Sequence, residues 1–129
     1  MGIETLLLIA SLMRSTTYGY GEFMCGDIGK PVPCAKGAIT ASGIEFDPSL
    51  PMAAIAAPTK FVLRAKVIGL RVEGGKCKRI HLVDKMNPRY IGVRGFDLSP
   101  AAVKLLTGDA HPKWSGRVEV CQLTAKKVK

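Results

Sequence analysis

The sequence predicts an all-β domain with one or two short helices. Short runs of alternating polar and apolar residues, bounded by glycine and proline, recur along the chain. A single helix of about eight residues is marked by Ser99 and Pro100 at its start and by Gly108 at its end. There is no internal repeat, heptad pattern or linker, and 129 residues suit one domain with one core.

The expected strands are short and differ in how regularly they alternate. The longest, residues 61–72, is apolar on odd positions and then on even ones, which indicates a bulge or a bend. After a turn at residues 73–76, the return strand places Ile80 and Leu82 on one face with Asp84. The remaining expected strands are residues 15–21, 38–43, 52–57 and 116–123.

The chain divides into an apolar segment (1–15), the β domain (16–124) and a basic tail (125–129). The apolar run at residues 6–13 is far shorter than the ~20 residues of a membrane span, so no transmembrane span is expected. It also lacks the preceding basic residue and the A-x-A site of a secretory signal. We expect a retained short helix that docks on the β domain or on a partner, with a cleaved signal as the alternative.

The net charge of +9 favours a polyanionic partner such as nucleic acid, an anionic membrane or a cell-wall polymer. The chain carries no aromatic-basic motif of a nucleic-acid-binding module. Specific nucleic-acid recognition is therefore not expected.

The four cysteines favour disulfides over a metal site. They have no CxxC spacing and only two histidines accompany them, so no metal is expected. A Cys25–Cys34 bridge would close a loop of turn-forming residues, and Cys77 and Cys121 both face outward on their strands, which permits a second bridge. Free buried thiols are the alternative. Disulfides would place the protein outside a reducing cytosol.

Two aspartates lie where a ligand could reach them. Asp84 ends an apolar strand just before a turn, and a carboxylate at the end of a barrel strand can contact a polymer. Its alternative role is to accept hydrogen bonds from the backbone of that turn. For Asp97, just before the capped helix, we expect that it secures the helix start or a chain crossing rather than performing chemistry.

Four segments carry a resemblance to a known family. Residues 17–19 (TYG) are similar to an opening Tyr-Gly segment, and residues 40–47 (TASGIEFD) to a Thr-Ala-x-Gly-Glu-x-Phe-Asp motif. Residues 83–88 (VDKMNP) resemble an Asn-Asp-Arg-Gly-Pro turn, and residues 96–102 (FDLSPAA) an Ile-Asp-Leu-Ser-x-Ala-Ala segment. These motifs are typical of the rare lipoprotein A family, which is related to expansins and barwin-like proteins. The resemblance implies a six-stranded double-psi β-barrel with one or two short helices.

Members of that family bind peptidoglycan glycan strands, and some cleave them as lytic transglycosylases. The resemblance implies that Asp84 is the acid/base and Glu45 the second carboxylate. An acid with a raised pKa protonates the glycosidic oxygen, and its carboxylate then takes the proton from the sugar's own 6-hydroxyl. The second acid stabilises the oxocarbenium-like centre. No cofactor is implied.

The candidates for substrate binding are Tyr18, Tyr20, Lys85 and Asp97. The tyrosines, with Trp114, offer stacking faces for sugars, or are buried aromatics as the alternative.

The chain departs from the family pattern at three places. Residues 53–57 lack the histidine of its Ala-Ala-His segment, Lys85 stands where the family has arginine, and Ile44 adds a residue before Glu45. Expansin-like members bind and loosen wall polymers without efficient cleavage. Cleavage and wall loosening therefore both stay open, and so does the groove or solvent position of Glu45.

The sequence thus predicts a peptidoglycan-directed domain, either a lytic transglycosylase or a wall-loosening module, in the periplasm, in the cell wall or on a phage tail. The alternative is a non-catalytic structural component of a virion tail or baseplate, which would contact other virion proteins through residues 3–13. A third option is a secreted barwin-like carbohydrate-binding protein.

Overall fold

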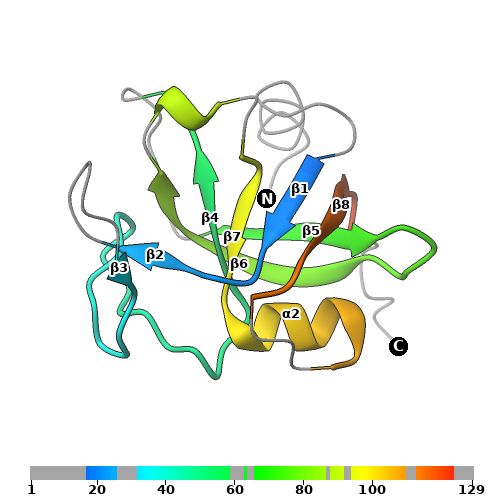
Figure 1. The fold of residues 1–129 in the computed structure, drawn as a ribbon, viewed down its shortest axis with the longest axis horizontal. Helices are drawn as coiled ribbons and strands as arrows, with labels where there is room; N and C mark the ends of the chain where they lie inside the picture. The colour runs from blue at the N-terminus through cyan, green and yellow to red at the C-terminus, as the bar shows by residue number, and fades with distance from the viewer. Residues whose placement is uncertain are drawn as a thin grey trace, which may run out of the picture.

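The structure is a computed structural model that describes residues 17–25, 32–58, 63, 66–86, 88–91, 94–109 and 113–123. Its main element is a closed barrel of six strands in the order β1-β7-β4-β6-β5-β8 (Figure 1). The prediction of an all-β barrel is confirmed. The strands are β1 (Thr17–Tyr20), β4 (Met52–Ala56), β5 (Lys66–Val72), β6 (Lys78–Met86), β7 (Phe96–Leu98) and β8 (Ser115–Cys121).

Two chain crossings give the barrel its double-psi topology. The chain passes from β1 to β4 across β7, and from β6 to β7 across β4. β1 is parallel to β7 and β6 is parallel to β4, while β4 and β7 are antiparallel to each other. The two crossing connections therefore share the central pair β4 and β7. As a result β1, β7, β4 and β6, which are far apart in the sequence, lie side by side.

Three smaller elements accompany the barrel: the two-stranded sheet of β2 (Met24–Cys25) and β3 (Val32–Pro33), the 3-10 helix η1 (Pro88–Tyr90), and α2 (Pro100–Thr107). α2 lies below the barrel strands in Figure 1. It begins and ends as predicted, because the Ser99 hydroxyl accepts a hydrogen bond from the Ala102 amide and Gly108 adopts a left-handed conformation with φ 88°.

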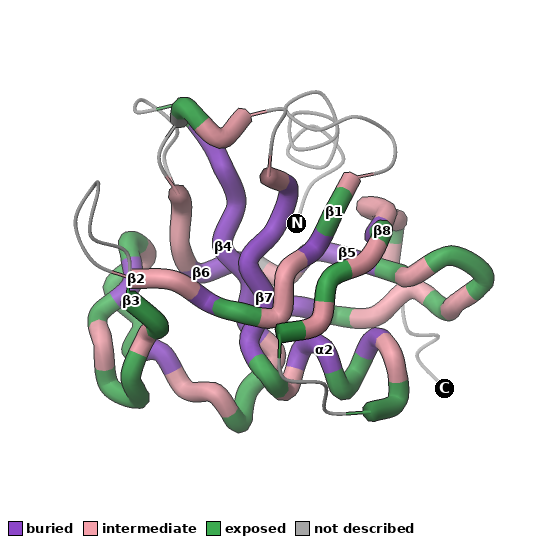
Figure 2. Tube along the Cα trace, viewed as in Figure 1, coloured by how far each residue is buried: buried purple, intermediate pink, exposed green. Residues whose placement is uncertain are grey.

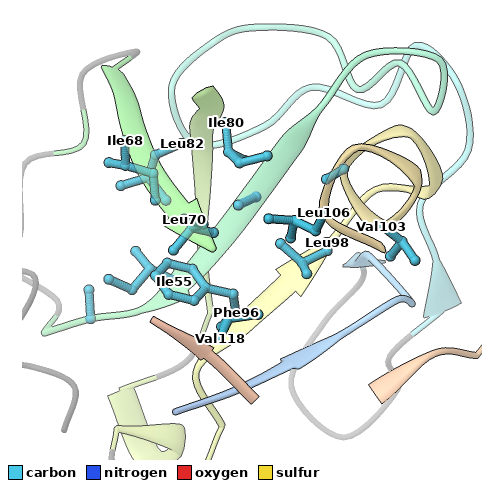
Figure 3. Packing of buried hydrophobic residues seen from close by; sticks show 13 residues of the cluster. Ile55, Ile68, Leu70, Ile80, Leu82, Phe96, Leu98, Val103, Leu106 and Val118 are labelled. Carbon is cyan, nitrogen blue, oxygen red and sulfur yellow. The ribbon is translucent and has the colours of Figure 1, made fainter. Parts of the chain in front are cut away.

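The main core fills the barrel and extends to α2. It takes alternate residues from β4, β5, β6 and β7, with Val118 from β8, together with the buried face of the helix (Figure 3). A second, smaller cluster lies on the opposite face of β4, where Phe23 and Phe46 pack with their ring centroids 4.6 Å apart. Since both faces of β4 are covered, this strand is buried along its length, as Figure 2 shows. The labelled residues of the main core are Ile55, Ile68, Leu70, Ile80, Leu82, Phe96, Leu98, Val103, Leu106 and Val118.

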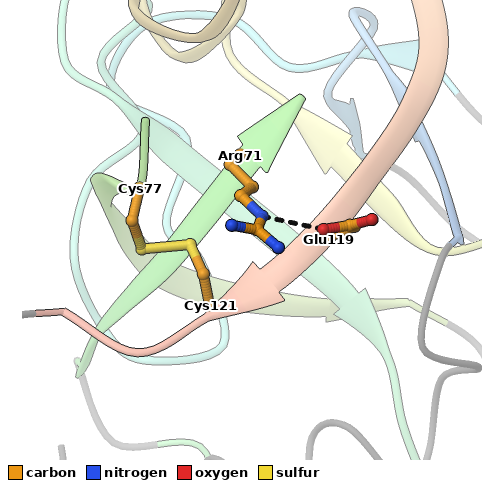
Figure 4. A network of polar contacts seen from close by, with 4 residues as sticks. All are labelled: Arg71, Cys77, Glu119 and Cys121. Carbon is orange, nitrogen blue, oxygen red and sulfur yellow. Dashed lines mark hydrogen bonds and ion pairs between the residues drawn. A yellow bond between two sulfur atoms is a disulfide. The ribbon is translucent and has the colours of Figure 1, made fainter. Parts of the chain in front are cut away.

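Both expected disulfides are present. Cys25–Cys34 joins β2 to the residue after β3, and Cys77–Cys121 joins the residue before β6 to the end of β8 (Figure 4). The second bridge passes over Gly69 of β5, where a Cβ atom would collide with the cystine sulfur and the Cys121 carbonyl. The same figure shows Arg71 of β5 donating to Glu119 of β8 at 2.7 Å, an exposed pair that contributes well under about 1 kcal/mol.

The strand predicted at residues 38–43 is wrong, and the one predicted at residues 61–72 is only partly described. Residues 38–43 do not form a strand: Ile39 makes an isolated bridge to Glu45, and the segment folds back as a tight hairpin. Of the long strand expected at residues 61–72, the structure has β5 from Lys66 onward, and the predicted inward positions Ile68 and Leu70 are buried in the core. Leu63, also described, is not in a strand and packs against the main core. The segments 1–15 and 125–129, and with them the docking residues 3–13, lie outside the described residues. In the part of the chain that the structure describes, no helix has both the length and the apolar character of a membrane span.

Candidate functional site

The outer face of the barrel carries a row of four residues at one level of four neighbouring strands. Ala54 of β4 pairs with Asp84 of β6 on one side and with Asp97 of β7 on the other. Asp97 in turn pairs with Tyr20 of β1. Directly paired residues project to the same face of a sheet. The row Tyr20, Asp97, Ala54 and Asp84, here called the acid row, therefore places two carboxyl groups on either side of a single methyl group.

Asp84 reaches this outer face because β6 contains a bulge. Ala53 pairs with Leu82, whereas the next residue, Ala54, pairs with Asp84, so Val83 is an extra residue in the ladder. Leu82 packs inside the barrel and Val83 packs in the outer cluster with Ala54. Simple alternation predicted Asp84 on the face of Ile80 and Leu82, and that prediction is wrong because the bulge reverses the facing of the strand.

Two backbone amides hold the half-buried side chain of Asp84 in place. The amides of Ala41 and Lys85 both donate to its Oδ1 atom, at 3.0 and 2.9 Å. Burial raises the pKa of Asp84, against the two hydrogen bonds and the positive charge of Lys85, which lower it. Asp84 thus accepts backbone hydrogen bonds, as the alternative role supposed, but from Lys85 within β6 and from Ala41 rather than from the turn that follows the strand, and it also faces outward.

Asp97 is 2% exposed and is bound from two sides. Arg94 donates from Nη2 to Oδ1 at 2.8 Å, and the Met24 amide donates to Oδ2 at 3.4 Å. Burial raises the pKa of Asp97 to about 6, against the charge of Arg94 and these hydrogen bonds, and the carboxylate of Asp84 raises it further. Asp97 does not cap the helix, since Ser99 does; instead it ties the connection that crosses β7 to that strand.

Aromatic rings and arginines border the acid row. The guanidinium of Arg94 lies 4.4 Å from the ring centroid of Tyr20 and 5.9 Å from that of Tyr90, so it stacks on rings while binding Asp97. Tyr18, two residues before Tyr20, lies on the same face of β1, is 47% exposed, and faces Arg117 of β8. Tyr18 is thus on the surface, whereas Tyr20 is half-buried beside Arg94.

Trp114 is partly buried and packs against the main core. Sequence reasoning missed Arg94 and Tyr90. The available signal for Arg94 was its position three residues before Asp97.

The contacts of Glu45 do not include the acid row. It is exposed, and its backbone bridges to Ile39 in the hairpin whose tip residue Ala41 donates to Asp84. Within the described residues, no hydrogen bond or ion pair joins the Glu45 side chain to either aspartate. The acid that the structure brings beside Asp84 is Asp97, and the catalytic role expected for Glu45 stays a prediction.

No group of three or more His, Cys, Asp or Glu side chains that could hold a metal ion occurs in the described part of the chain. His81 is exposed on β6, and His111 lies outside the described residues.

No family model matches the chain, and no curated protein matches its sequence. The membership suggested by the four motif segments therefore stays a prediction.

Proposed function

We propose that a glycan strand of peptidoglycan binds at the outer surface around the half-buried Asp84 of β6, next to the buried Ala54 and Asp97, and that Asp84 cleaves it as the acid/base of a lytic transglycosylase. The observation that carries this proposal is the acid row, in which Asp84 and Asp97 flank Ala54. The resemblance in four segments supports the choice of substrate. The net charge of +9 suits a wall polymer that carries carboxylate or phosphate groups.

Asp84 is suited to proton transfer because its two carboxyl oxygens differ. Both backbone hydrogen bonds end on Oδ1, and Oδ2 accepts none from the described residues. With its pKa raised by burial, Asp84 can carry a proton on Oδ2 and pass it to the glycosidic oxygen as the bond from that oxygen to C1 breaks. The Asp84 carboxylate then takes the proton of the sugar's 6-hydroxyl while O6 bonds to C1. The product is a 1,6-anhydro sugar, and Asp84 regains its proton.

Asp97 is the second acid of the row, but it is 2% exposed and out of reach of a bound sugar. It is fixed by Arg94 and by the Met24 amide, so it cannot swing away from the row. Above a pH of about 6 it is ionised and faces the same side of the sheet as Asp84. Because Asp97 is buried and paired with Arg94, it acts on the site through its charge interaction with Asp84, and Glu45 remains the acid that the resemblance implies for stabilising the positive charge at C1.

The surface tyrosines and the disulfides fit the same role. Tyr18 presents an exposed ring on β1 beside the acid row, where a sugar ring could stack on it, and the half-buried Tyr20 within the row is the second candidate. Two disulfides favour a location outside a reducing cytosol, whether periplasm, cell wall or virion.

The test is digestion of purified peptidoglycan sacculi. The unmodified protein should release 1,6-anhydro muropeptides, and Asp84→Asn, which keeps an oxygen acceptor but cannot transfer the proton, should lower the rate by about 100-fold or more. Glu73→Gln, in the exposed turn between β5 and β6, removes the same charge away from the row and should cleave normally. If the protein sediments with sacculi without releasing products, the barrel is a wall-binding or wall-loosening module and the cleavage proposal is wrong.

A non-catalytic component of a virion tail or baseplate is the second candidate. One observation favours it: Val32, Ile39, Ile44 and Leu50 are exposed apolar residues within the connection from β1 to β4, and such surfaces often contact partner proteins. This role is favoured if the protein neither releases products from sacculi nor sediments with them.

A further inference from the structure

We propose that the hairpin of residues 38–46 is the positioning element of Asp84, and that Thr40 is the residue through which the hairpin acts. This inference rests on the proposed role of Asp84 and adds the device that fixes its carboxyl group.

The hairpin is closed by its own backbone. The Phe46 amide donates to the Ala38 carbonyl at 2.7 Å, and the Thr40 amide donates to the Ile44 carbonyl at 3.0 Å. At the tip, the Gly43 amide donates to the Thr40 carbonyl at 2.9 Å, and Gly43 adopts a left-handed φ of 86° that glycine permits. The tip, residues 41–43, is therefore held at a defined place relative to the two arms.

The hydroxyl of Thr40 fastens this tip from inside. Thr40 is 4% exposed, and its Oγ1 atom donates to the Ile44 carbonyl at 2.6 Å and lies 2.9 Å from the Ser42 hydroxyl. Ser42 Oγ in turn accepts from the Ile44 amide at 3.4 Å. Since the Ile44 carbonyl also accepts from the Thr40 amide, loss of the hydroxyl removes one of its two hydrogen bonds together with the contact to Ser42, and the tip is held less firmly.

The tip docks on the bulge of β6 through two successive amides. The Ser42 amide donates to the Val83 carbonyl at 3.0 Å, and the Ala41 amide donates to Oδ1 of Asp84 at 3.0 Å. A bulge leaves one residue outside the regular ladder, which makes the Val83 carbonyl available to the hairpin. The same irregularity thus turns Asp84 outward and supplies the anchor for the element that holds it.

The consequence for chemistry lies in the choice of oxygen. Ala41 and Lys85 both bind Oδ1, so the proton of Asp84 is directed to Oδ2. The charged groups around this carboxyl are Lys85 on its own strand and Asp97 on β7 with its partner Arg94. Glu45, on the hairpin itself, is exposed. Of the hairpin's groups, the Ala41 amide is the one that contacts Asp84, and this hydrogen bond favours the ionised form.

The experiment measures the pKa of Asp84 by following its carboxyl ¹³C resonance with pH in the full chain. Thr40→Val, which replaces the hydroxyl with a methyl group, should loosen the tip, weaken the Ala41 hydrogen bond and raise the pKa of Asp84 by about one unit. Thr40→Ser keeps the hydroxyl and should keep the pKa. Thr107→Val is the matched control, because Thr107 Oγ1 also donates to a backbone carbonyl, that of Val103, but in α2.

A folded Thr40→Val variant with an unchanged Asp84 pKa would overturn the inference. A second measurement needs no variant: in the unmodified chain, the Ala41 amide proton resonance should titrate with the same midpoint as the Asp84 carboxyl, and an Ala41 resonance that does not respond would equally refute it. Both readouts are made without substrate. Failure of the protein to cleave sacculi would therefore contradict the proposed function and leave this result standing. If cleavage is observed, the pH profile of Thr40→Val should shift upward by the same amount, whereas that of Thr40→Ser should not.

Discussion

From Lys78 to Leu82, strand β6 pairs with β5 residue by residue, whereas from Asp84 to Met86 it pairs with β4 after a shift of one position. In the regular half, Ile80 and Leu82 are buried while Arg79 and His81 are exposed. In the bulged half, the two consecutive residues Val83 and Asp84 leave the barrel interior. The regular half builds the barrel, and the bulged half presents the acid and anchors the 38–46 hairpin.

The comparison shows that the pairing of β6, more than its composition, decides which of its residues face the core and which face outward. A strand that follows strict alternation must place a carboxylate two residues after Leu82 in the core, where an unpaired charge is costly. The bulge avoids that cost and places Asp84 beside Asp97 instead. The predictions below separate the two halves experimentally.

The largest expected effect on stability is the difference between removing the disulfide next to the regular half of β6 and removing the one near the acid row. Removing Cys77–Cys121, next to the regular half, by the double substitution Cys77→Ser and Cys121→Ser should lower the free energy of unfolding by about 4 kcal/mol, given the separation of 44 residues. Removing Cys25–Cys34, in the connection that serves the acid row, should cost about 3 kcal/mol, given a separation of 9. Urea unfolding of both double variants measures this order, and the opposite order would contradict it.

Core truncations should show a smaller contrast. Leu82 and Val83 are adjacent and both fully buried, but Leu82 packs in the main core and Val83 in the smaller outer cluster. Leu82→Ala should lower the free energy of unfolding by about 3 kcal/mol and Val83→Ala by about 2 kcal/mol. The same urea experiment applies. A larger cost for Val83→Ala would mean that the outer cluster, rather than the barrel interior, dominates stability.

The acid row should make stability depend on pH. Because the folded state raises the pKa of Asp97 from 3.8 to about 6, it binds the proton more tightly than the unfolded state does. This contribution is fully present below pH ~4 and is lost as pH rises through about 6, a decrease of at most about 3 kcal/mol.

The matching variant is Asp97→Asn, which has no proton to lose. Its free energy of unfolding, measured across the same pH range, should fall less with rising pH than that of the unmodified protein. Equal slopes in the two proteins would show that Asp97 has an ordinary pKa and is not buried as the structure places it.

The sequence predicted those features that a short segment specifies by itself. The alternation of Ile80 and Leu82 and the Ser99 cap are local signals, and the facing of Cys77 and Cys121 follows from the same alternation. The facing of Asp84 could not be predicted, because the bulge is defined by pairing with β4, which lies far away in the sequence.

The partners of the two acids were missed for a related reason. The amides of Ala41 and Met24 that bind them are backbone groups, and neither residue type marks such a role. Residues 38–43 read as a strand because their composition suits one, yet the buried Thr40 hydroxyl and Gly43 close them into a hairpin.

The most direct test is whether the charge of Asp84 changes the pKa of Asp97 on the other side of Ala54. The carboxylate of Asp84 contributes to the raised pKa of Asp97, and such coupling acts in both directions. The carboxyl ¹³C resonance of Asp97, followed with pH in the Asp84→Asn variant, should therefore titrate at a lower pH than in the unmodified protein, where it should titrate near pH 6. An Asp97 midpoint that is the same in both proteins would contradict the shared outer face on which the proposed chemistry depends.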